Sequence, residues 1–143
     1  MALLDQADPL ARVAGAVNAL RRTAHGRIEG ALLDGEGFVN GLDFARITCA
    51  GRRVLVLGAG GAAAAIAASL LTGERGTVAE MAIFDPAAGR AQALAQRLGK
   101  SSGARVIAVD NNGPAGFDLT TWTFWGIPRR PRVCAATPPL SAR

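Results

Sequence analysis

The sequence predicts an α/β fold, an incomplete doubly wound parallel sheet in a three-layer sandwich. Three apolar runs, at 53–57, 78–84 and 105–109, each stop at a glycine or an aspartate. Continuous apolar runs of this length are typical of strands that are buried on both faces, as in parallel sheets. Helical segments at 61–71 and 87–98 separate the runs, so the expected order is strand, helix, strand, helix, strand.

The elements before this core are shorter. Residues 1–14 are expected to end a helix, or to form a turn and a helix around Asp8-Pro9, and Gly15 breaks that segment. Two candidate strands follow at 16–22 and 27–32, joined by a short turn that contains a glycine.

A helix is then expected from Asp34 to about residue 45, with Asp34 as its N-cap, because a carboxylate there can accept backbone N–H groups. The chain therefore divides into an N-terminal piece at 1–45, the main α/β domain at 46–119, and an irregular tail at 120–143.

The net charge of +5 belongs to the tail. Residues 120–143 contain four arginines and no acidic residue, and the rest of the chain has 12 basic and 11 acidic residues. The main body therefore lacks the basic surface of a nucleic-acid-binding protein, and four arginines alone would give weak, salt-sensitive binding. The tail also holds four of the seven prolines and shows no periodicity, so we expect it to lie outside the core. A chain cut after Leu119 would then melt at an unchanged temperature.

The sequence also indicates a cytoplasmic protein. It contains no run of the ~18 apolar residues that a membrane span needs, and its N-terminus does not resemble a secretory signal. The two cysteines, Cys49 and Cys134, form no motif and are expected to be free thiols. No pattern of metal ligands is present.

The segment Gly58-Ala59-Gly60-Gly61-Ala62 lies between the first predicted strand and the first predicted helix of the main domain. Gly58 allows the tight turn, and Gly60 lets the backbone approach a pyrophosphate without a Cβ atom in the way. The helix N-terminus offers free N–H groups to the phosphates. This pattern predicts a Rossmann-like dinucleotide site; the alternative is a glycine-rich turn that binds no nucleotide.

Asp85 follows the second predicted strand, where an acidic residue can accept hydrogen bonds from the adenosine ribose and repel a 2′-phosphate. This favours NAD over NADP. Arg90 is close enough in sequence to contact a phosphate, which leaves NADP open, and Asp85 could instead be only a cap before Pro86.

Three motifs together resemble the shikimate/quinate dehydrogenase family: Gly15-Ala16-Val17-Asn18, the segment from Gly30 to Asp34-Gly35-Glu36-Gly37-Phe38, and VLVLGAGGAA at 54–63. The resemblance covers about residues 1–119. It implies an NAD(P)-dependent oxidoreductase of aromatic amino acid biosynthesis or quinate metabolism that acts on a CH–OH group. It also implies that Asn18 and Asp34 bind the substrate hydroxyls and that Asp34 assists proton transfer beside a catalytic lysine. The resemblance is also compatible with a homodimer. From the residues alone, Asn18 could be a turn residue and Asp34 a plain N-cap.

The sequence departs from the family pattern at several points. Leu32 and Leu33 stand where the family has Asn and Thr, which suggests quinate or a related acid rather than shikimate. The resemblance places the family's substrate domain, with its catalytic lysine, before Met1, and Lys100 cannot replace that lysine. Thr120 onward also departs, as a shifted reading frame would produce. We therefore expect a catalytically impaired fragment, with residues 1–45 as the edge of the substrate domain; the alternative is a non-catalytic dinucleotide-binding module.

Overall fold

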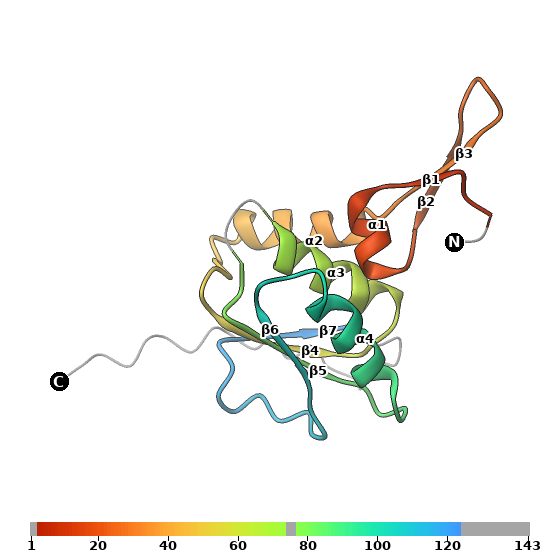
Figure 1. Ribbon diagram of the computed structural model, residues 1–143. Helices are drawn as coiled ribbons and strands as arrows, with labels where there is room; N and C mark the ends of the chain where they lie inside the picture. The colour runs from red at the N-terminus through yellow and green to blue at the C-terminus, as the bar shows by residue number, and fades with distance from the viewer. Residues whose placement is uncertain (1–2, 74–76, 124–143) are drawn as a thin grey trace, which may run out of the picture.

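The computed structural model of the chain describes residues 3–73 and 77–123 (Figure 1). The strands are β1 (Gln6–Ala7), β2 (Ala19–Arg22), β3 (Ile28–Ala31), β4 (Arg53–Leu57), β5 (Glu80–Phe84), β6 (Arg105–Ala108) and β7 (Leu119–Trp122). The helices are α1 (Pro9–Ala14), α2 (Asp34–Phe44), α3 (Gly61–Thr72) and α4 (Arg90–Gly99). Within these ranges, no helix is long and apolar enough to span a membrane.

The main sheet has the strand order β6-β5-β4-β7, and all of its strands are parallel. This confirms the α/β fold and the parallel pairing of the three strands predicted from the apolar runs. Leu55 pairs with Ala82, and Ala82 pairs with Ile107, which sets the register across the sheet. The carboxyl ends of the strands therefore meet at one edge, where ligands of such folds bind.

The core lies between this sheet and the helices. Val54 and Val56 of β4 and Met81 and Ile83 of β5 are fully buried in one cluster with α3 and α4. Small side chains along α3 let it approach β4 closely; the alanines at 63, 65, 67 and 68 are fully buried. This close packing places the N-terminus of α3 directly at the end of β4.

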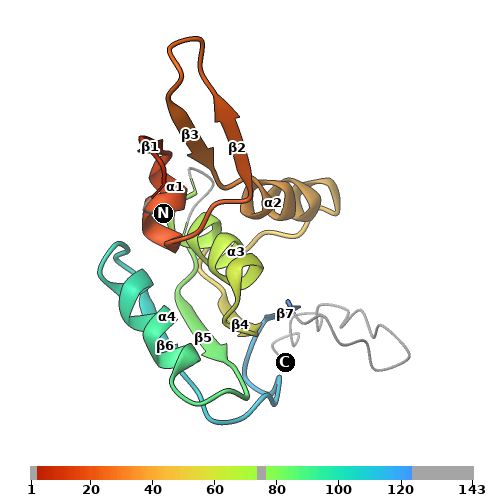
Figure 2. The same cartoon turned by 90° about the vertical axis from the view of Figure 1, so that its right-hand side faces the viewer.

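The second sheet has the order β1-β3-β2, and its β2–β3 hairpin projects away from the main sheet (Figure 2). The strands β2 and β3 are antiparallel, as the two predicted strands with a short turn require, but β2 begins at Ala19 rather than at residue 16. Asp8 joins this sheet to α1: its carboxylate accepts the Ala11 N–H at 2.6 Å and the Leu32 N–H at 2.8 Å.

The prediction that Asp34 is an N-cap is wrong. The N-cap position of α2 is Leu33, and Asp34 is the first helical residue, without a side-chain cap. The physical reason is that the helix begins one residue earlier, because the Leu33 carbonyl already accepts the Gly37 N–H at 3.0 Å. Asn18 Oδ1 accepts the Leu33 N–H at 2.9 Å. Asp34 still stabilises the helix, because an acidic group in the first turn interacts favourably with the helix dipole.

The prediction that residues 120–143 lie outside the core is wrong for Thr120–Trp122. These residues complete β7, which pairs with β4 from Val54↔Leu119 to Leu57↔Trp122, and Thr121 is buried. Thr121 is the one buried residue of β7, so the segment shows no apolar pattern. The rest of the predicted tail, 124–143, lies outside the described residues.

Candidate dinucleotide site

The phosphate loop has the geometry that its sequence predicts. It connects the end of β4 to the start of α3, and Gly60 is the N-cap of that helix. Within the described chain, the N–H groups of Gly60, Gly61 and Ala62 have no hydrogen-bond partner. Free N–H groups and the positive end of the helix dipole together make an anion-binding site.

Gly58 adopts a backbone φ of 115°, which a residue with a side chain rarely adopts. A Cβ atom at this position would also collide with the side-chain oxygen of Thr123. The Gly58 N–H donates to the Phe84 carbonyl at 2.7 Å, which ties the turn to the neighbouring strand. Both the conformation and the close contact therefore require glycine here.

Gly60 differs from Gly58, because its φ of −85° is open to any residue. A Cβ atom added at Gly60 would have only one neighbour within 4 Å, a guanidinium nitrogen of Arg90 at 3.7 Å. The protein itself therefore does not demand glycine at this position. The space that a side chain at Gly60 would occupy is open, as a bound pyrophosphate requires, so the residues present fit a dinucleotide.

Asp85 lies directly beside this loop. Its Oδ2 accepts the Ala59 N–H at 2.7 Å, and its Oδ1 accepts the Ala87 N–H at 2.9 Å. The carboxylate is almost completely buried, with a side-chain exposure of 2%. The bond to Ala87 forms a local turn, and α4 consequently starts at Arg90 rather than at residue 87.

Arg90 places its guanidinium near the same carboxylate, with Nε 3.9 Å from Asp85 Oδ2, and its side chain is 55% exposed. The phosphate loop, Asp85 and Arg90 thus come together at the carboxyl edge of the sheet. All seven cofactor-binding candidates lie in this one place: Gly58, Ala59, Gly60, Gly61, Ala62, Asp85 and Arg90.

The two substrate-binding candidates lie together at a different place. Asn18 precedes β2, and its Oδ1 accepts the N–H of Leu33, the neighbour of Asp34. The N–H of Asn18 donates to the Ala31 carbonyl at 3.0 Å. Both Asn18 and Asp34 are exposed. Leu32 is buried, whereas Leu33 is 54% exposed beside them, so an apolar side chain is part of this surface.

Helix α2, which carries Asp34, is fixed against α3 by a glycine. Gly35 is buried, and a Cβ atom there would collide with the Ala65 carbonyl and with Ser69 Oγ of α3. Ser69 Oγ is itself buried and finds no hydrogen-bond partner in the described part of the chain. The close helix contact at Gly35 therefore determines where Asp34 lies relative to the phosphate loop.

Sequence reasoning missed two residues that shape these sites. Asp8 connects α1 to Leu32 through the Leu32 N–H. The signal in the sequence was the pair Asp8-Pro9, because an N-cap residue is often followed by proline at the first helical position. Thr123 contacts the phosphate loop from the end of β7. No local pattern indicated it, because its partners are distant in sequence.

The fold and the loop define the class of protein, an α/β domain of the dinucleotide-binding type. No family model matches the chain. A curated shikimate dehydrogenase (NADP(+)) of Rubrobacter xylanophilus is 42% identical over 131 residues, which cover 88% of this chain and 45% of the relative.

Solved structures give the same result. Quinate dehydrogenase from Corynebacterium glutamicum in complex with NAD aligns with a TM-score of 0.74 and 29% identity, over 87% of this chain and 45% of that one. Shikimate 5-dehydrogenase from Thermus thermophilus in complex with NADP(H) and shikimate aligns with a TM-score of 0.68 and 34% identity, over 86% and 42%. By sequence and by fold, the chain matches the C-terminal part of the shikimate/quinate dehydrogenase family, and it spans less than half the length of these relatives.

Proposed function

We propose that this chain provides the NAD(P)-binding part of an oxidoreductase that acts on the CH–OH group of shikimate, quinate or a related hydroxy acid. The observation that carries the proposal is the open cradle at Gly60. Its neighbours would accept a side chain, yet the residue is glycine, at the N-terminus of a helix with free N–H groups. The relatives named above support the same chemistry.

In this proposal, the N–H groups of Gly60, Gly61 and Ala62 hold the pyrophosphate of the cofactor. The adenosine lies on the β5 side of the loop, where Asp85 and Arg90 are found. Two N–H groups and the nearby guanidinium offset the negative charge of Asp85, which weakens the repulsion of a 2′-phosphate. We therefore propose that the site accepts both NAD and NADP, with Arg90 as the residue that contacts the 2′-phosphate.

The substrate side of the proposal rests on Asn18 and Asp34. Oxidation removes a hydride from the CH–OH carbon of the substrate and a proton from its hydroxyl oxygen; the nicotinamide cofactor, when bound, would accept the hydride. Asn18 orients the hydroxyl, and Asp34 assists removal of the proton together with a base. The exposed Leu33 beside this pair favours an acid other than shikimate, because it offers no hydrogen bond to a further hydroxyl.

The sequence contains one lysine, Lys100, at the C-terminal end of α4 and far along the chain from Asp34. We propose that the 143-residue chain alone binds dinucleotide well but turns over hydroxy acids poorly, since general acid–base help is worth roughly 10²–10⁴-fold. A dinucleotide-binding module without catalysis is the alternative. We also propose a cytoplasmic location and a homodimer.

One experiment separates these possibilities. Steady-state formation of NADH and NADPH is measured with shikimate and with quinate, and the binding of both cofactors is measured on the same sample. The proposal expects cofactor binding together with turnover far below the ~10 s⁻¹ of a median enzyme. Absence of binding would overturn the cofactor assignment, whereas turnover near the median value would overturn the proposed impairment.

A further inference from the structure

Two side chains from other elements hold the corner between β3 and α2. The strand ends just before this corner, and the next two backbone N–H groups bond to side chains instead. Asp8 Oδ2 accepts the Leu32 N–H at 2.8 Å. Asn18 Oδ1 accepts the Leu33 N–H at 2.9 Å. Because Asp34 follows as the first residue of α2, its position depends on these two acceptors.

Asp8 is itself held firmly in place. Its Oδ1 accepts the Ala11 N–H at 2.6 Å as the N-cap of α1, and its backbone N–H donates to the Gly30 carbonyl at 3.0 Å. The helix is anchored in the core, since Ala11 and Ala14 are almost completely buried. The carboxylate therefore reaches Leu32 from a fixed part of the structure.

The two bonds of Asp8 explain why this residue is an aspartate. A carboxylate can accept at both of its oxygens, and bonds to an ionised acceptor are stronger than neutral ones. A serine caps a helix about equally well, but it offers one oxygen on a shorter side chain. Capping of α1 alone does not demand an acid at this position, whereas the second bond, to Leu32, does.

Asn18 depends on the same corner. Because its Oδ1 accepts the Leu33 N–H, its amide N–H groups remain for a ligand, and no residue at 3–73 or 77–123 accepts from them. A shift of Leu32 would carry Leu33 with it. Both the amide of Asn18 and the carboxylate of Asp34 would then move.

We propose that Asp8 is a positioning residue for the substrate, because its carboxylate fixes the corner that sets the spacing of Asn18 and Asp34. This inference rests on the proposed function, since it assumes that these two residues bind a substrate hydroxyl. Asp8 acts through Leu32 and need not touch the substrate. Its loss should affect the hydroxy acid and not the dinucleotide, because the phosphate loop belongs to the other sheet.

Asp8→Ser tests the inference, because it keeps the cap of α1 and removes the bond to Leu32. The chain is saturated with NADH and titrated with quinate and with shikimate by NMR, which detects weak complexes. The Kd for the acid should rise about five- to tenfold, the value of one hydrogen bond. The Kd for NADH, measured by calorimetry, should change less than about twofold.

Asp5→Ser is the matched control. Asp5 Oδ2 accepts the N–H of Ile28, at the other end of β3, at 2.6 Å. This variant should also lower the urea midpoint, yet it should leave the Kd for the acid unchanged. Asp8→Asn is a second test, because its single carbonyl oxygen can accept from only one of the two N–H groups. It should weaken acid binding as Asp8→Ser does.

Two results in the variants would overturn the inference. Equal loss of acid affinity in Asp5→Ser and Asp8→Ser would show that Asp8 only stabilises the small sheet. Unchanged acid affinity in folded Asp8→Ser or Asp8→Asn would show that the bond to Leu32 does not position the site. Failure of the proposed function is seen earlier, in the wild-type chain. A wild-type chain that binds NADH but neither acid would remove the substrate assignment and this inference with it.

Discussion

The carboxylate of Asp85 accepts the N–H of Ala59 in the phosphate loop, with 2.7 Å between Oδ2 and the nitrogen. A buried carboxylate is stable only when its oxygens are hydrogen-bonded, and Ala87 satisfies the second oxygen. The bond has two consequences. It fixes the loop to the end of β5, and under the proposed function it partly offsets the charge that would repel a 2′-phosphate.

Asp85→Ser tests both consequences. The loss of the charge should raise the NADP-to-NAD affinity ratio several-fold, because repulsion of the 2′-phosphate disappears while Arg90 remains. The loss of charge-assisted bonds should also lower the free energy of unfolding by roughly 1–3 kcal/mol. Calorimetric titrations and thermal melts measure the two effects. An unchanged affinity ratio would show that Asp85 acts only as a structural link between the loop and β5.

A second prediction concerns the contact between α2 and α3. Gly35→Ala places a methyl group against the Ala65 carbonyl and Ser69 Oγ, so the helices must separate. We expect a loss of about 1–3 kcal/mol in unfolding free energy, as for other overpacked sites. Gly41→Ala in the same helix meets no atom within 4 Å and should stabilise by about 0.5–1 kcal/mol. Equal urea midpoints for the two variants would contradict the close helix contact.

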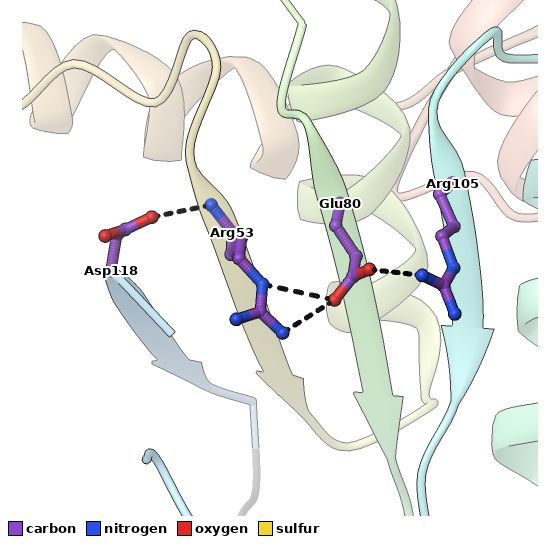
Figure 3. Close-up of polar contacts among 4 residues, drawn as sticks. All are labelled: Arg53, Glu80, Arg105 and Asp118. Carbon is purple, nitrogen blue, oxygen red and sulfur yellow. Dashed lines mark hydrogen bonds and ion pairs between the residues drawn. The ribbon is translucent and has the colours of Figure 1, made fainter. Parts of the chain in front are cut away.

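At the amino ends of the strands, opposite the phosphate loop, charged side chains connect all four parallel strands (Figure 3). Glu80 of β5 contacts Arg53 of β4 and Arg105 of β6, each at 3.1 Å. Asp118, just before β7, accepts the Arg53 N–H at 2.8 Å. Arg53 also lies over the ring of Phe117, 5.3 Å from its centre. These contacts fix the register at the amino ends of the strands, away from the cofactor.

Glu80→Gln should therefore destabilise the sheet without changing cofactor affinity. Both arginines are more than half exposed, so solvent screening limits the expected loss to about 0.5–1 kcal/mol. The difference from wild type should shrink as salt is added. Glu29→Gln breaks the more exposed pair with Arg21 and should cost less in the same melts. A Glu80→Gln variant that loses NADH affinity would contradict the separation of this network from the site.

Truncations test the role of β7. A chain that ends at Leu119 loses most of the strand, including buried Thr121 and the bonds from Thr123 to Leu57. We expect it to be less stable than a chain that ends at Thr123 by about 2–4 kcal/mol, at roughly 1 kcal/mol per hydrogen bond. This reverses the expectation from sequence that a cut after Leu119 is harmless. Identical melting temperatures would show that β7 adds nothing to the core.

The sequence was informative where backbone geometry depends on local residue type. The loop between β4 and α3 could be predicted because an apolar run followed by Gly58 and Gly60 is typical of a tight turn from a buried strand to a helix. Asp85 could be placed because strand ends of a parallel sheet meet at one edge. The parallel pairing of β4, β5 and β6 could be predicted from their apolar runs.

The errors arose where a distant residue provides the stabilising contact. Asp34 is not the cap because the helix begins one residue earlier, at the Leu33 carbonyl, and Asn18 from another element holds Leu33 through its N–H. The strand β7 was missed because its pairing with β4, and not an apolar pattern of its own, makes it a strand. The contact of Thr123 with Gly58 likewise depends on that pairing, so no reading of the local sequence could reveal it.

The central claim is that a dinucleotide binds at the phosphate loop, and Gly60→Val tests it most directly. The backbone at Gly60 tolerates a side chain and the surroundings are open, so the variant should keep its helix content by circular dichroism. The valine would occupy the space of the pyrophosphate. Calorimetric titration with NADH and NADPH should show binding to the wild-type chain and none to folded Gly60→Val. Equal affinity of the two proteins would contradict the account.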